Sequence, residues 1–334
     1  MRIVAAAVAL IVLVGPGVTM AQDTSADVLE RAAQRGLALL ESTSPAFIQK
    51  GGCNSCHNQK LAAAAQAFAR ERGIQTGATI AQLNDELSDA TTERFIEYAQ
   101  GGGAGASGLG YELFARVSAK QPGDARVQAQ LYYLRSMQRA DGSWRAGGNR
   151  PPLTFDDFTT TALILKALSV YTLPAQAADT RQRVDRARTW LLQTDPHSTQ
   201  ERAFRLMGLA WSKADRAAIE AAAANLQSQQ QRDGGWSQLD AMPTDAYATG
   251  MALYAMYQAG VSTRDAAYQS GLRYLLRTQA ADGTWHVKTR ALPIQPYFET
   301  GYPYDHDQWI SAAGAAYATM AITAAVEAPH IAAR

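Results

Sequence analysis

The sequence contains only two cysteines, Cys53 and Cys56, and a histidine, His57, directly follows the second one. Cys-x-x-Cys-His is the spacing of covalent c-type haem attachment, in which both thiols form thioether bonds and the imidazole binds the iron. We therefore predict one covalently bound haem c per chain. Cys53 and Cys56 would attach it, and His57 would be the proximal iron ligand.

Other uses of the cysteine pair agree less well with the sequence, but they stay open. A redox dithiol usually accompanies a βαβ pattern, and this sequence has none. A zinc site needs about four ligands, and no second cysteine pair is present to complete one. A disulfide across two intervening residues would leave the adjacent histidine unexplained.

The N-terminus bears on whether haem attachment is chemically feasible. Arg2 precedes an apolar run over residues 3–14, and Thr19 and Ala21 are small residues placed as a signal peptidase requires. The run is too short for a membrane-spanning helix. We predict a signal peptide over residues 1–21, and therefore a periplasmic or secreted protein, which is where haem is joined to such motifs. No later apolar run is long enough to cross a bilayer, so we expect no transmembrane segment after signal cleavage.

Composition narrows the fold class and the partners. The 31 basic and 30 acidic residues nearly cancel, which leaves no charge excess of the kind that nucleic-acid binding requires. Alanine dominates the apolar residues, whereas valine, isoleucine and threonine form no alternating runs. This pattern predicts an all-α protein of closely packed helices that does not bind nucleic acid.

A short motif recurs three times, each time after a leucine-rich helical stretch. Its copies are Gln138–Trp144, Gln231–Trp236 and Gln279–Trp285, and each contains Asp-Gly before the tryptophan. A loop follows each tryptophan, and an aspartate then precedes an alanine-rich helix: Asp157, Asp245 and Asp307. A repeat of roughly 50 residues indicates units that stack on one another and so bury apolar surface that one unit alone would leave exposed.

The repeat divides the chain into helical hairpins, each with an outer and an inner helix. We predict six of them, over residues 26–72, 79–120, 123–171, 183–213, 216–260 and 264–326. The haem motif falls in the first hairpin, at the place where other copies carry Asp-Gly-x-Trp. The glycine-rich run 101–110 is interpreted as a close approach of helices, so we expect residues 22–334 to form a single domain.

These repeats resemble the QW motif of squalene–hopene cyclases and of prenyltransferase β-subunits. The resemblance covers roughly residues 110–326 and, in degenerate form, the whole mature chain. It implies an α/α toroid, in which six outer helices surround six inner ones around an apolar cavity that would accept a hydrophobic or isoprenoid ligand. It also implies that the Gln, Asp-Gly and Trp of each motif staple an outer helix to the following loop.

The chemistry of these enzymes is not expected to carry over. The cyclases start their reaction at an Asp-x-Asp-Asp-Thr-Ala cluster, whose middle acid protonates an alkene. The nearest match here begins at Asp157, but Thr159 and Thr160 replace the two later acids. The prenyltransferases need a zinc held by Asp, Cys and His, and the cysteines here are assigned to haem. We interpret Asp157, Asp245 and Asp307 as N-caps of inner helices at the cavity rim.

In a ring of hairpins, all loops that lead from an outer to an inner helix lie on the same rim. The haem motif and the three tryptophan-bearing loops should therefore share one face of the molecule. The longest of these loops, residues 285–307, contains Tyr302 and Tyr304 among several aromatic residues and prolines. A loop of this length is usually functional or disordered, and its composition favours an ordered lid at the cavity rim. We call it the lid loop.

The lid loop offers candidates for a second iron ligand. His306 is the first candidate, followed by His286 and by Met242 in the rim loop of the fifth hairpin. An open coordination position or a ligand from a partner protein is the alternative. His197, in an Asp-Pro-His-Ser turn, and His330, near the C-terminus, are expected at the surface.

Two classes of function agree with these features. The first is an exported mono-haem cytochrome that exchanges electrons with a periplasmic redox partner protein and uses the toroid as its scaffold. The second is a haem-dependent enzyme or sensor that acts on an isoprenoid or other lipid in the toroid cavity. Terpene cyclase or prenyltransferase activity is disfavoured because the acidic cluster is incomplete, and a binding protein with a vestigial haem is a further alternative. We expect electron transfer.

Overall fold

The computed structural model describes residues 23–51, 55–77, 80, 105–148, 150–293 and 296–327. Outside these ranges lie the predicted signal peptide, Cys53, His330 and most of the first helix expected in the second hairpin. Within them, the regular secondary structure is helical apart from two short strands, β1 (Trp236–Ser237) and β2 (Thr244–Asp245), which pair antiparallel. The all-α fold is therefore confirmed.

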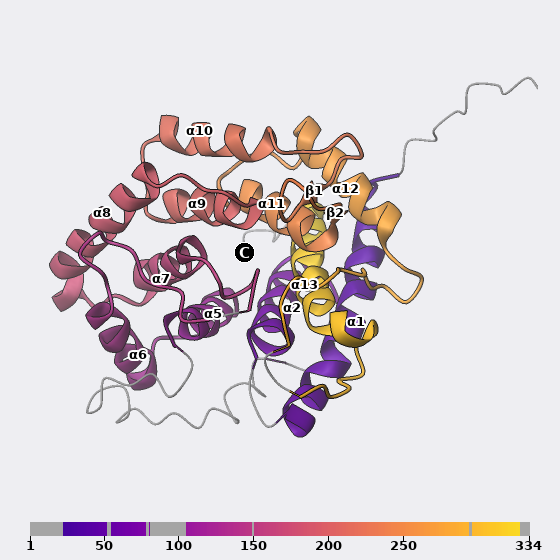
Figure 1. Cartoon of the computed structure of the whole chain (residues 1–334), viewed down its shortest axis with the longest axis horizontal. Helices are drawn as coiled ribbons and strands as arrows, with labels where there is room; N and C mark the ends of the chain where they lie inside the picture. Colours follow the sequence, from indigo (N-terminus) through magenta and orange to yellow (C-terminus); the bar gives the residue numbers. More distant parts are fainter. Residues whose placement is uncertain are drawn as a thin grey trace, which may run out of the picture.

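The helices form two concentric layers (Figure 1). The outer layer contains α1 (Ala26–Gly51), α6 (Ala125–Ser136), α8 (Ala177–Gln193), α10 (Arg216–Gln227) and α12 (Ala266–Thr278). The inner layer contains α2 (Leu61–Glu71), α5 (Gly105–Ser118), α7 (Asp157–Tyr171), α9 (Thr199–Trp211), α11 (Ala246–Gln258) and α13 (Gln308–Ala325). Each inner helix packs against the next one, and α13 returns to pack against α2, which closes the ring. This arrangement is the predicted α/α toroid.

The bounds of the described helices follow the predicted hairpins with one clear difference. The fourth hairpin begins at Ala177, several residues before the predicted position 183. Pro174 opens a short 3-10 turn, η2 (Pro174–Gln176), which leads directly into α8. Proline is favoured at the start of a helix because its missing N–H has no partner to lose there.

Burial differs between the two layers. Helix α13 is buried along almost its whole length, whereas α8 buries only Thr180, Ala187 and Leu191. Small residues allow the inner helices to approach closely, since a Cβ atom at Gly250 in α11 would overlap the backbone of Ala318 in α13. Within the described ranges, none of the helices combines the length and the apolar character needed to cross a membrane.

The repeated motif joins neighbouring outer helices. In each copy the tryptophan is fully buried, and its indole N–H donates to a leucine carbonyl near the end of the preceding outer helix. The motif glutamine donates to its own loop and to the next outer helix, as Gln138 does to the carbonyls of Gly142 and Arg183. The last copy closes the outer layer, because Gln279 donates to the carbonyl of Ala32 in α1. The motif therefore staples two outer helices together as well as closing its own loop.

One position of the motif differs from the prediction. In the second copy, the glutamine that makes these bonds is Gln230, which donates to the carbonyls of Gly234 and Ala267. The predicted residue, Gln231, does not reach the next helix through its side-chain amide, which donates within its own turn. Gln230 is the residue with the same spacing to its tryptophan as the glutamines of the other two copies.

The interior of the ring contains hydrogen-bonded polar side chains. Tyr111 of α5 and Tyr317 of α13 are fully buried, and the hydroxyl of Tyr111 donates a hydrogen bond of 3.0 Å to the carbonyl of Leu153. Tyr247 of α11 contacts Tyr317 edge-on at 5.5 Å and donates a hydrogen bond of 2.6 Å to Gln200 of α9. The resemblance implied an apolar cavity here, whereas these tyrosines place hydroxyl groups among the inner helices, and those of Tyr111 and Tyr247 can be buried because they are paired.

Candidate functional site

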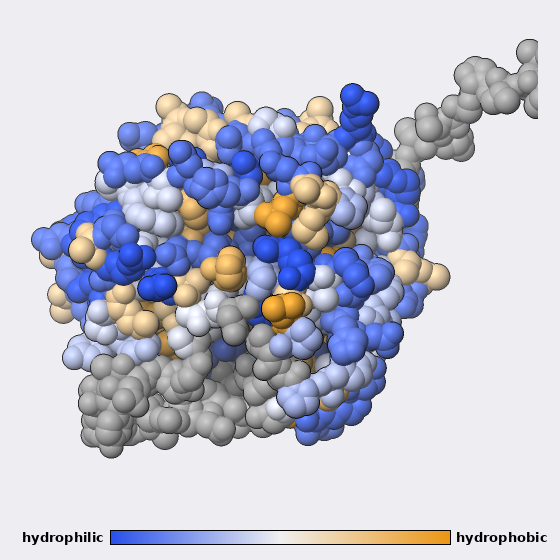
Figure 2. Space-filling model, in the orientation of Figure 1, coloured by the Kyte–Doolittle hydropathy of each residue, from blue (hydrophilic) through white to orange (hydrophobic). Residues whose placement is uncertain are grey.

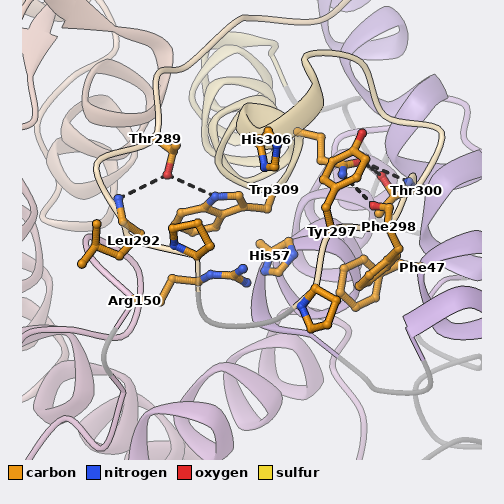
Figure 3. A pocket seen from close by; sticks show the side chains of 14 residues that line it. Phe47, His57, Arg150, Thr289, Leu292, Tyr297, Phe298, Thr300, His306 and Trp309 are labelled. Carbon is orange, nitrogen blue, oxygen red and sulfur yellow. Dashed lines mark hydrogen bonds between the residues drawn. The ribbon is translucent and has the colours of Figure 1, made fainter.

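A cavity with a volume of about 220 Å³ lies on the rim that carries the outer-to-inner loops (Figure 3). Its walls come from segments far apart in the sequence: Phe47 in α1, His57 in the haem motif, Arg150 in the loop before α7, and residues between Thr289 and Trp309. The haem motif and two of the rim loops therefore meet at one cavity, as the repeat geometry predicts.

The haem motif leads into a short π-helical segment, η1 (Cys56–Lys60), which continues as α2. The hydroxyl of Ser55 accepts a hydrogen bond of 3.0 Å from the N–H of Asn58 and caps the start of this segment. The side chain of Gln59 accepts from the N–H of Ser55 at 2.8 Å and donates to the carbonyl of Ser44 in α1 at 2.7 Å. These bonds hold the motif against α1. Single π-helical turns occur frequently at functional sites.

His57 is the central buried group of this site. Its side chain is 4% exposed, and its ring contacts Phe47 at 5.2 Å and Trp309 at 5.7 Å, both edge-on. Its Nε2 atom is buried and has no hydrogen-bond partner, which costs free energy in a protein interior. Burial, and to a smaller degree the charge of Arg150, lowers the pKa of His57 to about 3. The imidazole is therefore neutral at physiological pH, and the neutral form is the one that binds a metal.

These properties fit a residue that would bind the iron of a haem. A porphyrin would supply the other nitrogen ligands, so one neutral imidazole with an unpaired nitrogen would be a sufficient ligand from the protein. Among the described residues, no group of three or more His, Cys, Asp or Glu side chains could hold a metal ion by itself. Cys56 is partly exposed.

The structure brings one of the three candidate second ligands to this cavity. His306 is exposed and lines the cavity together with His57 (Figure 3). His286 is not among the lining residues, and its Nε2 atom lies 2.8 Å from Oδ2 of Asp307. Met242 lies in the loop between β1 and β2 and does not line the cavity either. His306 therefore stays the leading candidate.

The rim aspartates at α7 and α11 have different roles. Asp245 is the N-cap of α11, as predicted, and accepts a hydrogen bond of 2.8 Å from the N–H of Ala248. For α7 the N-cap is Asp156, not the predicted Asp157. Asp157 is the first residue of the helix and instead accepts a hydrogen bond of 2.7 Å from the N–H of Ala146. The prediction for α7 was therefore wrong by one residue.

Asp307 precedes α13 but makes no capping hydrogen bond, because the 3-10 turn η3 (Asp305–Asp307) runs directly into the helix. Its carboxylate accepts from the N–H of Thr289 at 2.8 Å and lies 3.3 Å from Nζ of Lys288, so it joins the two ends of the lid loop. The predicted rim residues are all outside the lining of the cavity beside His57: Asp157, Asp245, Asp307, Tyr302 and Tyr304. His197 is exposed, as predicted.

Among the residues of the site, Phe47, Arg150 and Trp309 were missed at the sequence level. The guanidinium of Arg150 lies over the ring of Trp309, 4.6 Å from its centroid. The position of Arg150 was a usable signal, because the repeat geometry places its loop on the same rim as the haem motif. Trp309 gave no such signal, since it follows the start of an inner helix and resembles any other buried residue there.

Solved structures of two kinds of protein share this architecture. The type II terpene cyclase MstE from Scytonema matches with a TM-score of 0.56 and 13% identity over 90% of this chain and 99% of the cyclase. A variant of MstE bound to its substrate geranylgeranyl dihydroxybenzoate matches with a TM-score of 0.52 and 13% identity over 86% and 98% of the two chains. A possible GH105 family member from Salmonella enterica matches with a TM-score of 0.51 and 13% identity over 93% and 96%.

No protein-family description matches this sequence, and no curated protein does. At identities this low, the structural similarity establishes the α/α toroid fold alone. The same fold carries different activities in the neighbours, so the function must be argued from the site.

Proposed function

We propose that this chain is an exported, mono-haem c-type cytochrome that transfers electrons, built on a terpene-cyclase-like toroid. The observation that carries the proposal is His57, a buried imidazole with an unpaired Nε2 atom that lines a cavity and directly follows the cysteine spacing used for haem attachment. The proposed export to the periplasm rests on the signal-peptide pattern over residues 1–21.

Each residue of the site has a defined part in this proposal. Cys53 and Cys56 hold the haem covalently, His57 binds its iron, and the haem supplies a centre that gains or loses one electron. Phe47 and Trp309 exclude water from the imidazole, and the polarity around such a centre tunes its reduction potential. The hydrogen bonds of the η1 segment hold the haem motif against α1. His57 would therefore keep its position when the haem gains or loses an electron.

The buried tyrosines of the inner layer favour electron transfer over chemistry on a lipid. MstE has been solved with geranylgeranyl dihydroxybenzoate as its substrate. In this chain Tyr111, Tyr247 and Tyr317 are fully buried in the inner layer, so an isoprenoid would have to displace paired hydroxyl groups. The match to the cyclase acid cluster is also incomplete, and its first member, Asp157, lies 3.4 Å from the guanidinium of Arg139 at the rim.

The surface beside the cavity suits a transient protein partner. Leu292 and Tyr297, which line the cavity, are 83% and 47% exposed. The face of the molecule in Figure 2 is mostly hydrophilic, with small and separate hydrophobic patches over its described residues. Small apolar contacts within a polar surface are typical of weak redox encounters, which supports a periplasmic redox partner protein.

The haem assignment is tested by expressing the full chain in bacteria that mature c-type cytochromes and weighing the denatured protein. We expect the mass of a chain that starts at Gln22 plus one haem, and no added haem in the Cys53→Ala/Cys56→Ala variant. His57→Ala should keep the covalent haem and lose the optical spectrum of imidazole-bound iron, whereas His197→Ala, at an exposed histidine, should change neither. A wild-type chain without haem, made in cells that load a reference cytochrome, contradicts the proposal.

Electron transfer itself needs a separate measurement. Reversible reduction without uptake of CO supports it, because two ligands from the protein leave no open position on the iron. His306→Ala should then open the site to CO, while His286→Ala should not. A wild-type reduced protein that binds CO would favour a haem-dependent enzyme or sensor instead.

A further inference from the structure

A buried ion pair joins the haem motif to the neighbouring inner helix. Lys60 is the last residue of the η1 segment and is 5% exposed, and its Nζ atom lies 3.5 Å from Oε2 of Glu112 in α5. The same ammonium group donates to the carbonyl of Gly108, one turn before Glu112, at 3.4 Å. Lys60 is three residues from His57 in the same short segment. Contacts of its side chain therefore also restrain the segment that carries the imidazole.

Glu112 is held in place by side chains of α6. The side-chain amide of Gln130 donates to Oε1 of Glu112 at 2.7 Å, and the guanidinium of Arg126 lies 3.8 Å from the same oxygen. Burial acts to raise the pKa of Glu112, but the charge of Lys60, the bond from Gln130 and the charges of nearby arginines lower it below its ordinary value. The carboxylate is therefore ionised at neutral pH and balances the charge of Lys60.

Stability alone does not explain these two charges. Removing two charges from water costs free energy, and a buried ion pair is seldom more stable than an apolar pair of the same size. Lys60 is the only Lys, Arg, Asp or Glu residue between positions 55 and 69, and the five residues that follow it are buried and apolar. The charge therefore lies at the junction between the haem motif and α2, where an apolar residue would continue the buried face.

We infer that the ion pair of Lys60 and Glu112 positions His57 and sets the charge around it. The pair anchors the η1 segment to α5, while the bond from Gln59 to the carbonyl of Ser44 anchors it to α1. Because both charges are buried, water and salt screen them little, and each acts strongly on an electron added at the iron that His57 would bind. The effect of the charge rests on the proposed function, whereas the anchor does not.

The first experiment compares the reduction of the full haem-loaded protein with that of its variants at a fixed solution potential. Glu112→Gln leaves the charge of Lys60 unbalanced, which favours the added electron. The ratio of reduced to oxidised protein should therefore rise, roughly tenfold for one buried charge. Lys60→Met leaves the charge of Glu112 and should lower the ratio by a similar factor. The variant with both substitutions should return the ratio close to its wild-type value.

The opposite signs identify an effect of charge. A merely structural role would move the ratio in the same direction in Glu112→Gln and Lys60→Met, because both substitutions break the same contact. A change in the same direction, or no change in either variant, overturns the inference.

Glu71→Gln is the matched control. Glu71 of α2 lies 3.0 Å from Nζ of Lys120, just beyond the end of α5, so this pair joins the same two inner helices at their other ends (Figure 1). Both of its side chains are exposed, and surface ion pairs contribute little. Glu71→Gln should leave the ratio unchanged. A change as large as that of Glu112→Gln would overturn the inference, because it would show a general effect of charge between α2 and α5.

The second experiment measures the anchor alone, in protein produced without haem. Reduced protein reacts with N-ethylmaleimide, and mass spectrometry of its peptides follows the labelling of Cys56, which is partly exposed. Glu112→Gln and Lys60→Met should each speed the labelling roughly tenfold, because a buried charge without its partner releases the segment. The double variant and Glu71→Gln should label at nearly the wild-type rate. Circular dichroism first confirms that each variant is folded.

Glu112→Asp replaces a single variant that does not fold. It keeps the charge but shortens the reach of the carboxylate, so it should speed the labelling of Cys56 and leave the reduction ratio near its wild-type value. Labelling at the wild-type rate in these variants overturns the inference, whether or not the chain binds haem. A chain without haem fails the proposed function, and the labelling then decides the inference by itself. A haem-loaded chain with unchanged ratios and rates fails the inference and leaves the proposed function in place.

Discussion

The first hairpin and the tryptophan-bearing hairpins use the same position of the repeat differently. In the latter, each indole N–H of Trp144, Trp236 and Trp285 donates to a leucine carbonyl, and the loop is closed. In the first hairpin, the corresponding segment leaves Nε2 of His57 and the side-chain amide of Asn58 buried without partners. Buried polar groups are nearly always paired, so these exceptions need an explanation, and a bound group provides one for His57. The comparison teaches that three repeats close their loops with a buried tryptophan, while the first leaves buried polar atoms for which the proposed haem would account.

The largest expected effect comes from removing a staple. Trp236 is fully buried and its indole N–H lies 2.9 Å from the carbonyl of Leu226. Trp236→Ala should therefore lower the free energy of unfolding by about 3 to 5 kcal/mol, measured by urea unfolding followed by circular dichroism. Trp211, a half-buried tryptophan outside the motif, is the control, and Trp211→Ala should cost clearly less. Equal losses of stability in Trp236→Ala and Trp211→Ala would show that the motif tryptophans stabilise the fold no more than other tryptophans.

A smaller effect is expected from the glycine that closes the outer layer. Gly283 has a φ of 89°, and a Cβ atom there would overlap the carbonyl oxygen of Arg35 in α1. Gly260 has a φ of 84°, but nothing lies within 4 Å of its Cβ position. Gly283→Ala should lower the free energy of unfolding by about 2 to 4 kcal/mol, and Gly260→Ala by about 1 kcal/mol, because only the first adds a steric overlap to the backbone strain. If Gly283→Ala and Gly260→Ala lower the free energy of unfolding equally, the motif copy Gln279–Trp285 does not pack tightly on α1.

Asp245, the N-cap of α11, predicts that the free energy of unfolding depends on pH. Burial raises the pKa of Asp245 to about 6, although the hydrogen bonds it accepts act in the opposite direction. Between about pH 4 and pH 6 the folded state therefore holds a proton that the unfolded chain has released, and the contribution of this group to the free energy of unfolding falls as the pH rises. Asp245→Asn keeps an N-cap and removes the titration.

The measurement is the difference in unfolding free energy between the wild type and Asp245→Asn across this pH range. We expect the wild type to lose about 1 to 3 kcal/mol relative to the variant as the pH rises from about 4 to about 6. Asp215→Asn is the control, because Asp215 makes no side-chain capping bond to α10. Parallel curves for the wild type and Asp245→Asn would contradict the prediction.

The smallest effect on stability is expected at His57 in protein produced without haem. Phenylalanine fills a similar space and removes the unpaired buried nitrogen, so His57→Phe should change the free energy of unfolding by no more than about 1 kcal/mol in either direction. In haem-loaded protein the same substitution should abolish the spectrum of imidazole-bound iron. A stability loss as large as that of Trp236→Ala would show that the imidazole of His57 stabilises the fold. The first hairpin would then not differ from the tryptophan-bearing hairpins in its role.

The sequence by itself determined the repeated helical hairpins. The composition and the spacing of the three tryptophan motifs predicted stacked all-α units, because each motif acts over a short stretch of chain and its repetition lets neighbouring units bury apolar faces together. That the stack closes into a toroid was implied by the resemblance to the QW repeat. The haem assignment to Cys53, Cys56 and His57 comes from an equally local pattern and stays a prediction. What these predictions share is that every residue in them lies within one repeat.

Only the tertiary structure decided which side chains surround His57 and which meet inside the ring. The repeat geometry placed the loops of Arg150 and His306 on the rim of the haem motif, but only packing brings these side chains and Trp309 into one cavity with His57. The tyrosines meet in the ring interior for the same reason. The misplaced cap at α7 has a related cause, since a shift of one residue turns a side chain toward a different neighbour, and packing selects among adjacent residues of similar type. The misplaced motif glutamine differs, because the spacing to the tryptophan already distinguishes Gln230 from Gln231.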